Sequence, residues 1–414
     1  MLPSPGARFS ARSERFPRLW AGRRGRKLRA MTAGTSQPGR LRVIIVGGGV
    51  AGLEAALALA DLAPDRTDVT MIAPNTEFVY RPMAVREPFA YGAARRYPLA
   101  PIVRDAGARL LRGELDRIDP ARNAVHTKQE EQIEYDAILL TLGARVVPRY
   151  AHALTIDDSR LDETLHGLIQ DVEGGYVHSL AFVSSASIAW PLPLYELALM
   201  TAGRAYDMEI DLAVTVITAE PAPLAVFGAA ASSAVAERLR TARIETIASA
   251  AAEVPSGREV LIRPGDRRLQ VDRVIALPEL TGPALDGIPV REGGFIPVDA
   301  HGQVPGVGPV YAAGDATDFA VKQGGIASQQ ADAAAEAIAA SAGAPVTPRP
   351  FEPVVRGMLL TDGKPLYLIA RLAAGQEPSC EVSDEPTWSP PAKIAAKYLA
   401  PYLEERDRDS ATAQ

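Results

Sequence analysis

Three glycines in a short run are the residues of this chain whose spacing points most directly to chemistry. Gly47, Gly49 and Gly52 follow a β-branched run, residues 41–46, and precede an alanine- and leucine-rich helical stretch, residues 51–62. In a strand–turn–helix unit, such glycines permit a tight turn, let backbone N–H groups approach a pyrophosphate, and allow close packing of the helix on the sheet. The helix dipole adds attraction for phosphate. We therefore predict a dinucleotide-binding turn made of Gly47, Gly48, Gly49, Ala51 and Gly52.

One departure from the usual pattern concerns the ribose contact. An acidic residue is expected about 20 residues after the turn, where it would hold the ribose hydroxyls of the nucleotide. This chain has Ala73 and Pro74 there, which leaves Asn75 or Glu77 to take over the contact. We assign Asn75 to the cofactor site. A glycine-rich turn without a ligand is the competing interpretation of the motif.

Two further segments place polar residues directly after an expected strand. Residues 311–315 read Tyr-Ala-Ala-Gly-Asp and place Asp315 between an apolar strand and a helix expected over residues 326–340. Residues 141–144, Thr-Leu-Gly-Ala, follow a buried strand expected at residues 135–140. An Ala-Gly-Asp run by itself is often only a turn. Its occurrence together with the glycine motif and the Thr-Leu-Gly-Ala run indicates a cofactor site.

With these three motifs in this order, residues 41–345 resemble the pyridine nucleotide-disulfide oxidoreductase superfamily of flavoproteins. The resemblance implies FAD as the cofactor, with Asp315 hydrogen-bonded to its ribityl chain and the following helix directed at the flavin. It also implies that Thr141, Gly143 and Gly314 belong to the cofactor site.

Within that superfamily the chain is most similar to sulfide:quinone reductases and type II NADH:quinone reductases. The similarity rests on residues 78–82, Phe-Val-Tyr-Arg-Pro, and on residues 322–325, Lys-Gln-Gly-Gly, before the last helix. It implies that Arg81 and Pro82 join the cofactor site, and that Lys322 and Gln329 act catalytically near the isoalloxazine ring and its quinone face. A lysine there would stabilise negative charge on the ring. Solvated residues at the start of a helix are the alternative for both side chains.

A single cysteine, Cys380, separates this chain from the thiol chemistry of its relatives. Sulfide:quinone reductases use redox cysteines beside the flavin, and disulfide reductases carry a close pair. One cysteine forms no intramolecular disulfide, so neither mechanism operates as described. We interpret Cys380 as incidental. The scarcity of thiols also fits a cytoplasmic protein.

The second α/β unit lacks the glycine turn that a nicotinamide nucleotide needs. Residues 184–191 read Ser-Ser-Ala-Ser-Ile-Ala-Trp-Pro, and the side chains of Trp190 and Pro191 would obstruct a pyrophosphate, while proline removes an N–H donor. NAD(P) is therefore a disfavoured second cofactor. Glu220, after the next strand, remains as a ribose ligand, although a surface acid is the interpretation we prefer.

The order of elements predicts an α/β fold with two Rossmann-like dinucleotide-binding domains, the second inserted in the first, plus a small C-terminal hairpin and helix region. Residues 354–361 and 365–372 form the hairpin, joined through Asp362 and Gly363. The predicted boundaries are a disordered basic tail at 1–39, the FAD-binding domain at 40–150 and 291–345, the inner NAD(P)-binding-like domain at 151–290, and an interface or membrane-contact region at 346–414.

Charge and hydropathy restrict the partners. Residues 1–30 hold eight arginines and Lys27 against one acid, Glu14, so the rest of the chain is strongly acidic and would repel nucleic acid. No window approaches the roughly 18 apolar residues that cross a bilayer.

Residues 392–405 place Ile394, Tyr398, Leu399, Tyr402 and Leu403 on one helical face, interrupted by Pro401. This face lies on a membrane, on the protein's own core, or in a homodimer interface.

These observations predict an FAD-dependent oxidoreductase that passes electrons from an unidentified small-molecule donor through FAD to a quinone, without redox cysteines and without a metal. The location expected is cytoplasmic, with peripheral contact on the inner membrane face left open. An NAD(P)H:quinone oxidoreductase is the first alternative. A flavin-binding sensor or assembly protein without turnover is an alternative of another class.

Overall fold

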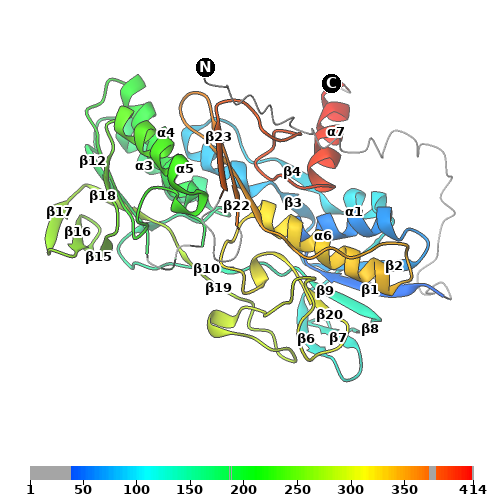
Figure 1. Cartoon of the computed structure of the whole chain (residues 1–414). Coiled ribbons are helices and arrows are strands. Elements are labelled where there is room, and N and C mark those ends of the chain that lie inside the picture. The colour runs from blue at the N-terminus through cyan, green and yellow to red at the C-terminus, as the bar shows by residue number, and fades with distance from the viewer. Residues whose placement is uncertain (1–38, 186, 188, 373–378, 413–414) are drawn as a thin grey trace, which may run out of the picture. The chain divides into compact units, whose positions relative to one another are not determined.

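The computed structural model describes residues 39–185, 187, 189–372 and 379–412 (Figure 1). The basic tail predicted at residues 1–39 lies outside the described residues except for Gly39. Within the described part of the chain, no helix combines the length and the apolar character that a membrane span requires.

The first domain is built on a parallel sheet of five strands. Their order is β20 (Val310–Ala312), β9 (Ala137–Leu140), β1 (Leu41–Val46), β2 (Thr67–Ala73) and β5 (Arg109–Arg112). The strand that follows the inner domain, β20, therefore returns to pair with β9. This return confirms the prediction that the second domain is inserted in the first.

Side-chain alternation along β1 explains why this sheet is covered on both faces. Val43 and Ile45 pack in the core formed with the helices, whereas Ile44 and Val46 pack in a separate core on the opposite face. Successive side chains of a strand point to opposite faces, so an uninterrupted apolar run requires cover on both. The helices are α1 (Val50–Leu62), α2 (Leu99–Asp105) and α6 (Gly324–Ser341).

Smaller elements complete the first domain. A three-stranded antiparallel sheet packs on the face away from α1 and consists of β6 (Leu115–Asp119), β7 (Ala124–Thr127) and β8 (Gln132–Glu134). The hairpin of β3 (Glu77–Val79) and β4 (Arg96–Pro98) encloses the 3-10 helix η1 (Arg81–Phe89). Two further 3-10 helices are η3 (Glu292–Gly294) and η4 (Gly314–Ala316). The chain crosses between the domains through an antiparallel pair, β10 (Arg145–Val147) and β19 (Glu279–Thr281).

The inner domain repeats the same architecture. Its parallel sheet has the order β11 (Leu154–Thr155), β18 (Arg273–Ala276), β12 (Ser179–Val183), β13 (Ala213–Ile217) and β14 (Glu245–Ile247). Its helices are α3 (Leu161–Glu173), α4 (Leu192–Asp207), η2 (Ala225–Phe227) and α5 (Ala229–Thr241). An antiparallel sheet of β15 (Ala251–Ser256), β16 (Glu259–Arg263) and β17 (Arg267–Gln270) follows β14. Two Rossmann-like units are thus confirmed.

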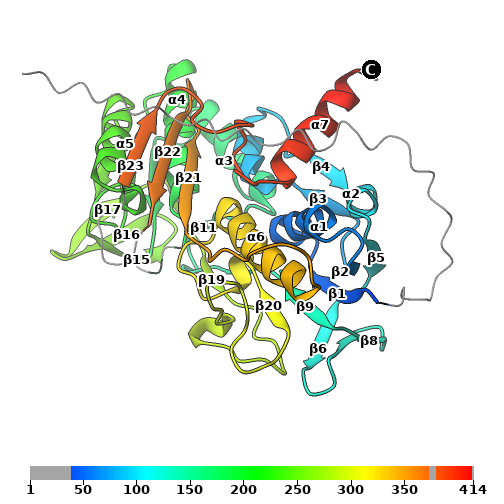
Figure 2. The same ribbon diagram turned by 45° about the vertical axis from the view of Figure 1, so that its right-hand side comes forward.

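The predicted C-terminal hairpin is confirmed and gains a strand. Strands β21 (Val354–Leu359) and β22 (Leu366–Arg371) pair antiparallel, and β23 (Ser379–Ser383) adds on the far side of β22. Strand β23 was not predicted, because Ser379, Cys380 and Glu381 give no apolar run. Figure 2 shows this sheet beside α5 of the inner domain.

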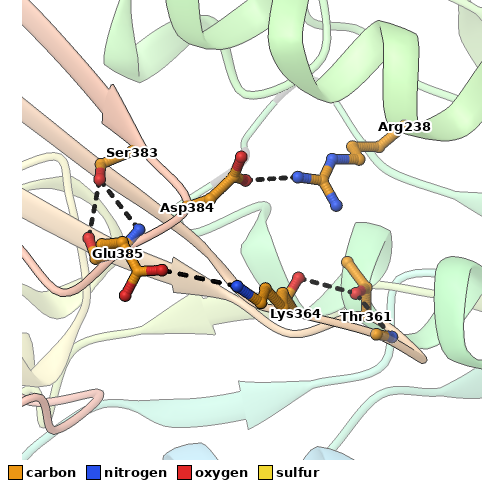
Figure 3. A network of polar contacts seen from close by, with 7 residues as sticks. Arg238, Thr361, Lys364, Ser383, Asp384 and Glu385 are labelled. Carbon is orange, nitrogen blue, oxygen red and sulfur yellow. Dashed lines mark hydrogen bonds and ion pairs between the residues drawn. The ribbon is translucent and has the colours of Figure 1, made fainter.

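The C-terminal sheet is attached to the inner domain mainly by apolar packing. Figure 3 shows Arg238 of α5 in an ion pair with Asp384, at 2.5 Å, and Lys364 beside Glu385, at 3.5 Å. Exposed ion pairs of this kind contribute about 0 to 1 kcal/mol. Buried aliphatic side chains of β21 and β22 join the inner-domain core, and these are Val355, Leu359, Leu366 and Leu368. Their burial fixes the position of the sheet.

The amphipathic C-terminal face packs on the protein's own core. Helix α7 spans Leu399–Thr412, so it begins later than the sequence pattern suggested. Pro401 lies in its first turn and does not break it, because an N–H there has no intrahelical acceptor. All five apolar residues of the predicted face are buried in the first-domain core: Ile394, Tyr398, Leu399, Tyr402 and Leu403. Of the three alternatives, the structure shows packing on the core, and this face is not free to lie on a membrane.

Candidate cofactor and substrate site

The glycine turn has the geometry that its sequence implies. Gly47 has a φ of +118°, and a Cβ at this position would lie 2.3 Å from the backbone oxygen of Thr141. A Cβ on Gly52 would lie 2.0 Å from the oxygen of Gly47, so only glycine fits where α1 leaves the sheet. Gly49, in contrast, is exposed and has open space around it. The turn is closed against the sheet and open toward solvent at the point where a pyrophosphate would approach.

The start of α1 is free to bind an anion. Gly49 is the N-cap, no side chain caps the helix, and no acidic residue occupies its first turn. Thr141 braces the turn from β9, since its hydroxyl donates to the carbonyl oxygens of Val46 and Gly47 at 2.9 and 3.1 Å. Gly314 lies against the same helix start, where an added Cβ would be 3.3 Å from that of Ala51. The predicted motifs at 47–52, 141–143 and 314–315 therefore meet at one edge of the sheet.

A buried glutamine shapes the turn that carries Asp315. Gln330 of α6 accepts a hydrogen bond from the backbone N–H of Gly314 at 2.8 Å, and the hydroxyl of Thr317 donates to the carbonyl of Gly314 at 2.9 Å. Burial raises the pKa of Asp315 to about 6; the nearby Asp158 acts in the same direction, and Lys322 opposes it. Gln330 was not predicted as a site residue, because its role depends on the fold bringing α6 against this turn.

Lys322 is held inside the site rather than in solvent. Its side chain is 7% exposed, and Nζ donates to the carbonyl of Thr317 and lies 4.1 Å from the centre of the Phe295 ring. Burial lowers the pKa of Lys322 to about 8, although Asp315 and Asp318 favour its charged form. The alternative of a solvated lysine does not describe its surroundings.

The start of α6 carries an unsatisfied donor. Gln323 is the N-cap, and its Oε1 accepts the backbone N–H of Gly325 at 2.7 Å. Its Nε2 is buried and has no hydrogen-bond partner among the residues that the structure describes. Buried polar groups in folded proteins are nearly always paired, so this donor indicates a ligand. An acceptor-rich ring such as isoalloxazine fits this position, which lines the same cavity as Asp315 and Lys322.

These groups border a cavity of about 240 Å³ to which three parts of the chain contribute. The first domain supplies Arg81, Pro82, Val85, Asp315, Lys322, Gln323 and Gly324. The inner domain supplies a mainly apolar wall that includes Ile156, Leu161, Trp190, Leu192, Pro193 and Leu277. Residues 356–358 of β21 and residues 393–394 complete the lining. Asp315, Lys322 and Gln323 thus lie toward the α6 end, whereas the inner-domain lining is mainly apolar, with Asp158, Ser185 and Glu196 as its polar members.

The inner-domain helix start that would face a second nucleotide has few donors to offer. Pro191 is the N-cap of α4 and Pro193 follows in its first turn, and neither has an N–H. The N–H of Leu194 is used by the carbonyl of Pro191, at 3.1 Å. Trp190 lines the cavity and packs against the ring of Phe227, with ring centres 5.9 Å apart. Ala186 and Ile188 of this loop lie outside the described residues.

Glu220 differs from the surface acid that we preferred. It is partly buried, and burial raises the pKa of its carboxyl. Tyr195 donates to Oε2 at 2.7 Å, and the N–H of Ala225 donates to Oε1 at 3.1 Å. Both oxygens are therefore engaged inside the domain, which disfavours a contact with ribose.

The remaining predicted residues divide into two groups. Arg81 and Pro82 line the cavity, and Arg81 pairs with Asp158 of the inner domain at 3.1 Å. Asn75 is exposed after β2. Gln329 is not among the cavity-lining residues, and both ends of its amide bond the backbone of Val354, at 2.9 Å. It anchors β21 to α6, so we do not carry its predicted catalytic role into the proposed function.

A buried ion pair in the cavity wall was not foreseen from the sequence. Nζ of Lys393 lies 2.7 Å from Oε1 of Glu196 and 3.0 Å from the carbonyl oxygen of Pro82. Oε1 also accepts the N–H of Leu360 at 2.8 Å. Burial lowers the pKa of Lys393 and raises that of Glu196, while the attraction between them opposes both shifts. The pair joins the first domain, the inner domain and the C-terminal region at the cavity.

Comparison with proteins of known structure confirms the resemblance that the motifs predicted. The sulfide-quinone reductase of Aquifex aeolicus (strain VF5) is 30% identical over 110 residues, which span 25% of each chain. The structure of the sulfide:quinone oxidoreductase from Aquifex aeolicus superposes with a TM-score of 0.73 at 20% identity, covering 88% of this chain and 90% of that chain. The short alignment spans only about a quarter of the curated relative.

Two other solved structures share the fold at lower similarity. A ferredoxin reductase for the CYP199A2 system of Rhodopseudomonas palustris gives a TM-score of 0.62 at 19% identity, covering 81% of this chain and 83% of that chain. NDH2 of Plasmodium falciparum in complex with NADH gives 0.55 at 15% identity, covering 67% of this chain and 64% of that chain. Structural similarity at these levels of sequence identity shows that the fold is shared.

The sequence profile of one family covers most of both dinucleotide domains. The profile of the pyridine nucleotide-disulphide oxidoreductases matches residues 41–175 and 195–337, more than half of the chain. Its members bind FAD, which confirms the predicted cofactor and leaves NAD(P) open as a second one. The matched ranges contain the glycine turn, the Thr141 segment and the Asp315 turn. The chain therefore belongs to the pyridine nucleotide-disulphide oxidoreductase family.

Proposed function

We propose that this protein is an FAD-dependent oxidoreductase that passes electrons from a small-molecule donor through FAD to a quinone. The observation that carries the proposal is the asymmetry of the cavity. Asp315 in η4 and Lys322 and Gln323 just before α6 supply polar groups, whereas the inner-domain lining is mainly apolar, with Asp158, Ser185 and Glu196 as its polar members. A neutral, flat, apolar substrate fits such a wall better than a phosphate-bearing one.

FAD would be held by groups that the structure brings together. The turn at Gly47–Gly52 and the open start of α1 would take the pyrophosphate, and Asp315 would accept from the ribityl hydroxyls, as the family resemblance implies. The free Nε2 of Gln323 would donate to the ring system. When bound, FAD supplies the hydride and electron chemistry, while the protein supplies position and electrostatics.

The chain's own residues set the charge around the cavity. Lys322 favours negative charge that develops beside it, because its ammonium is buried and poorly screened there. Lys393 and Glu196 neutralise each other in the cavity wall, so this pair adds no net charge beside an apolar acceptor. Cys380 takes no part, since it lies in β23 and is not among the cavity-lining residues.

The NAD(P)H:quinone alternative has less support from the site. Phosphate recognition needs N–H donors at a helix start, and α4 begins with two prolines near its N-cap. The acid at the end of β13, Glu220, is already engaged. A relative that binds NADH shares the fold, so this alternative is kept as a defined outcome of the test. A cytoplasmic location also belongs to the proposal, as do peripheral membrane contact and a homodimer through a surface other than the buried C-terminal face.

Anaerobic titration of the purified protein tests this function. The flavin absorbance is followed while a panel of donors is added, and a short-chain quinone is then supplied to measure reoxidation. Gly49→Val, which we expect to fold without FAD, serves as the matched control. Donor-dependent bleaching followed by quinone-dependent recovery supports the proposal. Bound FAD that no donor reduces would favour the sensor or assembly protein, and rapid saturable reduction by NADH would favour the dehydrogenase.

A further inference from the structure

A buried carboxylate on α1 receives the start of the C-terminal helix. Glu54 is 0% exposed, and Oε1 accepts the backbone N–H groups of Lys397 and Tyr398 at 2.7 and 2.9 Å. Oε2 accepts the N–H of Leu399, the first residue of α7, at 2.6 Å. The first N–H groups of a helix have no intrahelical acceptor, and these carboxyl oxygens accept the N–H groups at and just before the start of α7. Glu54 therefore fixes the point where α7 begins.

The same short segment forms part of the cavity wall. Lys393 reaches Glu196 and Pro82 there, and the backbone N–H of Ile394 donates to the hydroxyl of Tyr80 at 2.8 Å. The side chain of Ile394 packs directly on Gly324 at the start of α6, where an added Cβ would lie 2.8 Å away from it. Only residues 395 and 396 separate this wall from the backbone that Glu54 holds. Movement at Lys397 would therefore be transmitted to the cavity.

A second carboxylate makes this anchor sensitive to protonation. Asp332 of α6 lies beside Glu54, and its Oδ1 is buried without a hydrogen-bond partner in the described part of the chain. Charged groups around the pair are Asp61 on α1, Glu336 on α6, Arg349 in the following linker, and Lys397 with Tyr398 in the C-terminal segment. Two buried carboxylates resist simultaneous ionisation, because each raises the cost of charging the other.

We propose that Glu54, with Asp332 beside it, is a positioning residue for the cavity: its hydrogen bonds to residues 397–399 hold Lys393 and Ile394 in the wall that faces the proposed flavin and acceptor. The expected effect of Glu54 on the flavin and on quinone reduction rests on the proposed function. The attachment of residues 397–399 to Glu54 is independent of that function. Glu54 lines no part of the cavity and acts through the C-terminal segment.

The sign of the pH response follows from burial. Burial raises the pKa of Glu54 to about 7, and the three backbone N–H groups and Lys397 only partly oppose it. The pKa of Asp332 is raised as well, by burial and by Glu54. Because the docked state binds the proton more tightly than a free carboxyl does, the docked segment is favoured at low pH and loses stability as the pH rises through about 7.

Limited trypsin cleavage after Lys397 measures the anchor directly in the full-length holoprotein. Glu54→Gln replaces one acceptor oxygen by an amide that repels the N–H of Leu399, so we expect cleavage about tenfold faster than in the wild type. Asp332→Asn removes the neighbouring charge, and we expect slower cleavage than in the wild type above neutral pH. Comparing variant and wild type at each pH cancels the pH dependence of trypsin itself.

A matched control separates positioning from simple attachment of α7. Asp105 accepts the hydroxyl of Tyr402 at 2.6 Å and pairs with Arg406 at 3.3 Å, one turn further along the helix. Glu54→Gln should shift the absorbance of the bound flavin and raise the KM for quinone with a smaller change in kcat, whereas Asp105→Asn should leave all three unchanged. Conservative Glu54→Asp should restore part of the difference.

Defined results would overturn the proposal. Unchanged cleavage after Lys397 in Glu54→Gln would remove the anchor, and equal effects of Asp105→Asn and Glu54→Gln on the flavin would show attachment without positioning. Identical pH profiles of wild type and Asp332→Asn would exclude the coupling of the two carboxylates. If the wild type bound no FAD, the proposed function would fail, while the cleavage comparison on the same protein would still decide the anchor.

Discussion

Nζ of Lys393 lies 2.7 Å from the carboxylate of Glu196, and the two side chains are 4% and 0% exposed. Removing one member of such a pair leaves an unpaired buried charge, which costs about 3 to 5 kcal/mol. We expect Lys393→Met to lower the free energy of unfolding by this amount. The double variant Glu196→Met with Lys393→Met should regain most of the loss, because no charge is then left unpaired. Denaturant unfolding of the two variants checks this, and equal destabilisation by both would contradict it.

The surroundings of two glycines in the cofactor turn distinguish loss of FAD binding from disruption of the turn itself. A Cβ at Gly49 would have no described atom within 4 Å, so Gly49→Val should fold and yet block the approach of the pyrophosphate. Gly52→Ala should disturb the turn itself, because its Cβ would lie 2.0 Å from the oxygen of Gly47. Flavin absorbance per mole of protein, together with circular dichroism, distinguishes the two. Gly49→Val purified with a full complement of FAD would argue against this site.

Asp315 should contribute to cofactor affinity in a pH-dependent way. Asp315→Ala removes a charge-assisted hydrogen bond worth roughly 1.5 to 3 kcal/mol, which corresponds to FAD binding about 10 to 150 times weaker. Because the pKa of Asp315 is raised to about 6, its carboxylate is lost as the pH falls through that value, and wild-type affinity should fall with it. Titration of apoprotein with FAD across this range measures both effects. An affinity independent of pH in the wild type would remove the role of the carboxylate.

Lys322 should raise the reduction potential of bound FAD while its ammonium is protonated. Its pKa is lowered to about 8 by burial, so the positive charge is lost as the pH rises through that value, well below the range of an ordinary lysine. Lys322→Met should therefore have the lower potential at neutral pH, and the difference from the wild type should vanish above about pH 8. Equilibration with reference dyes measures the potential without the natural donor. A constant difference at every pH would show that the charge of Lys322 is not responsible.

Donor choice provides the fifth prediction. NADH and NADPH should reduce the flavin slowly and without saturation, because Pro191 and Pro193 leave the start of α4 short of phosphate donors. Sulfide should form no persulfide on the protein, because a lone Cys380 cannot cycle through an internal disulfide. Cys380→Ser should keep any activity, since Cys380 lies in β23 and does not line the cavity. Anaerobic stopped-flow measurements test each statement. Loss of quinone reduction in Cys380→Ser would show that this thiol takes part.

Local backbone demands made the cofactor turn visible in the sequence. Gly47 needs a positive φ, and Gly52 needs a close approach to the backbone. Only glycine meets these conditions, so glycine at these two positions predicts the geometry of the turn. The parallel strands β1, β9 and β20 were likewise expected, because apolar runs buried on both faces leave a clear pattern. The inserted second domain followed from the repetition of strand and helix signals.

The tertiary structure alone decided how distant side chains are used. Glu196 and Lys393 are 197 positions apart, and an ordinary helical glutamate and lysine become a buried pair only when α4 and the C-terminal segment meet. The apolar face at residues 394–403 had three partners compatible with its periodicity, and packing against α1 selected one. Gln329 and Gln330 are adjacent and chemically identical, but one holds β21 and the other the Asp315 turn. Periodicity specifies which residues share a face, whereas burial and pairing depend on which elements the fold brings opposite that face.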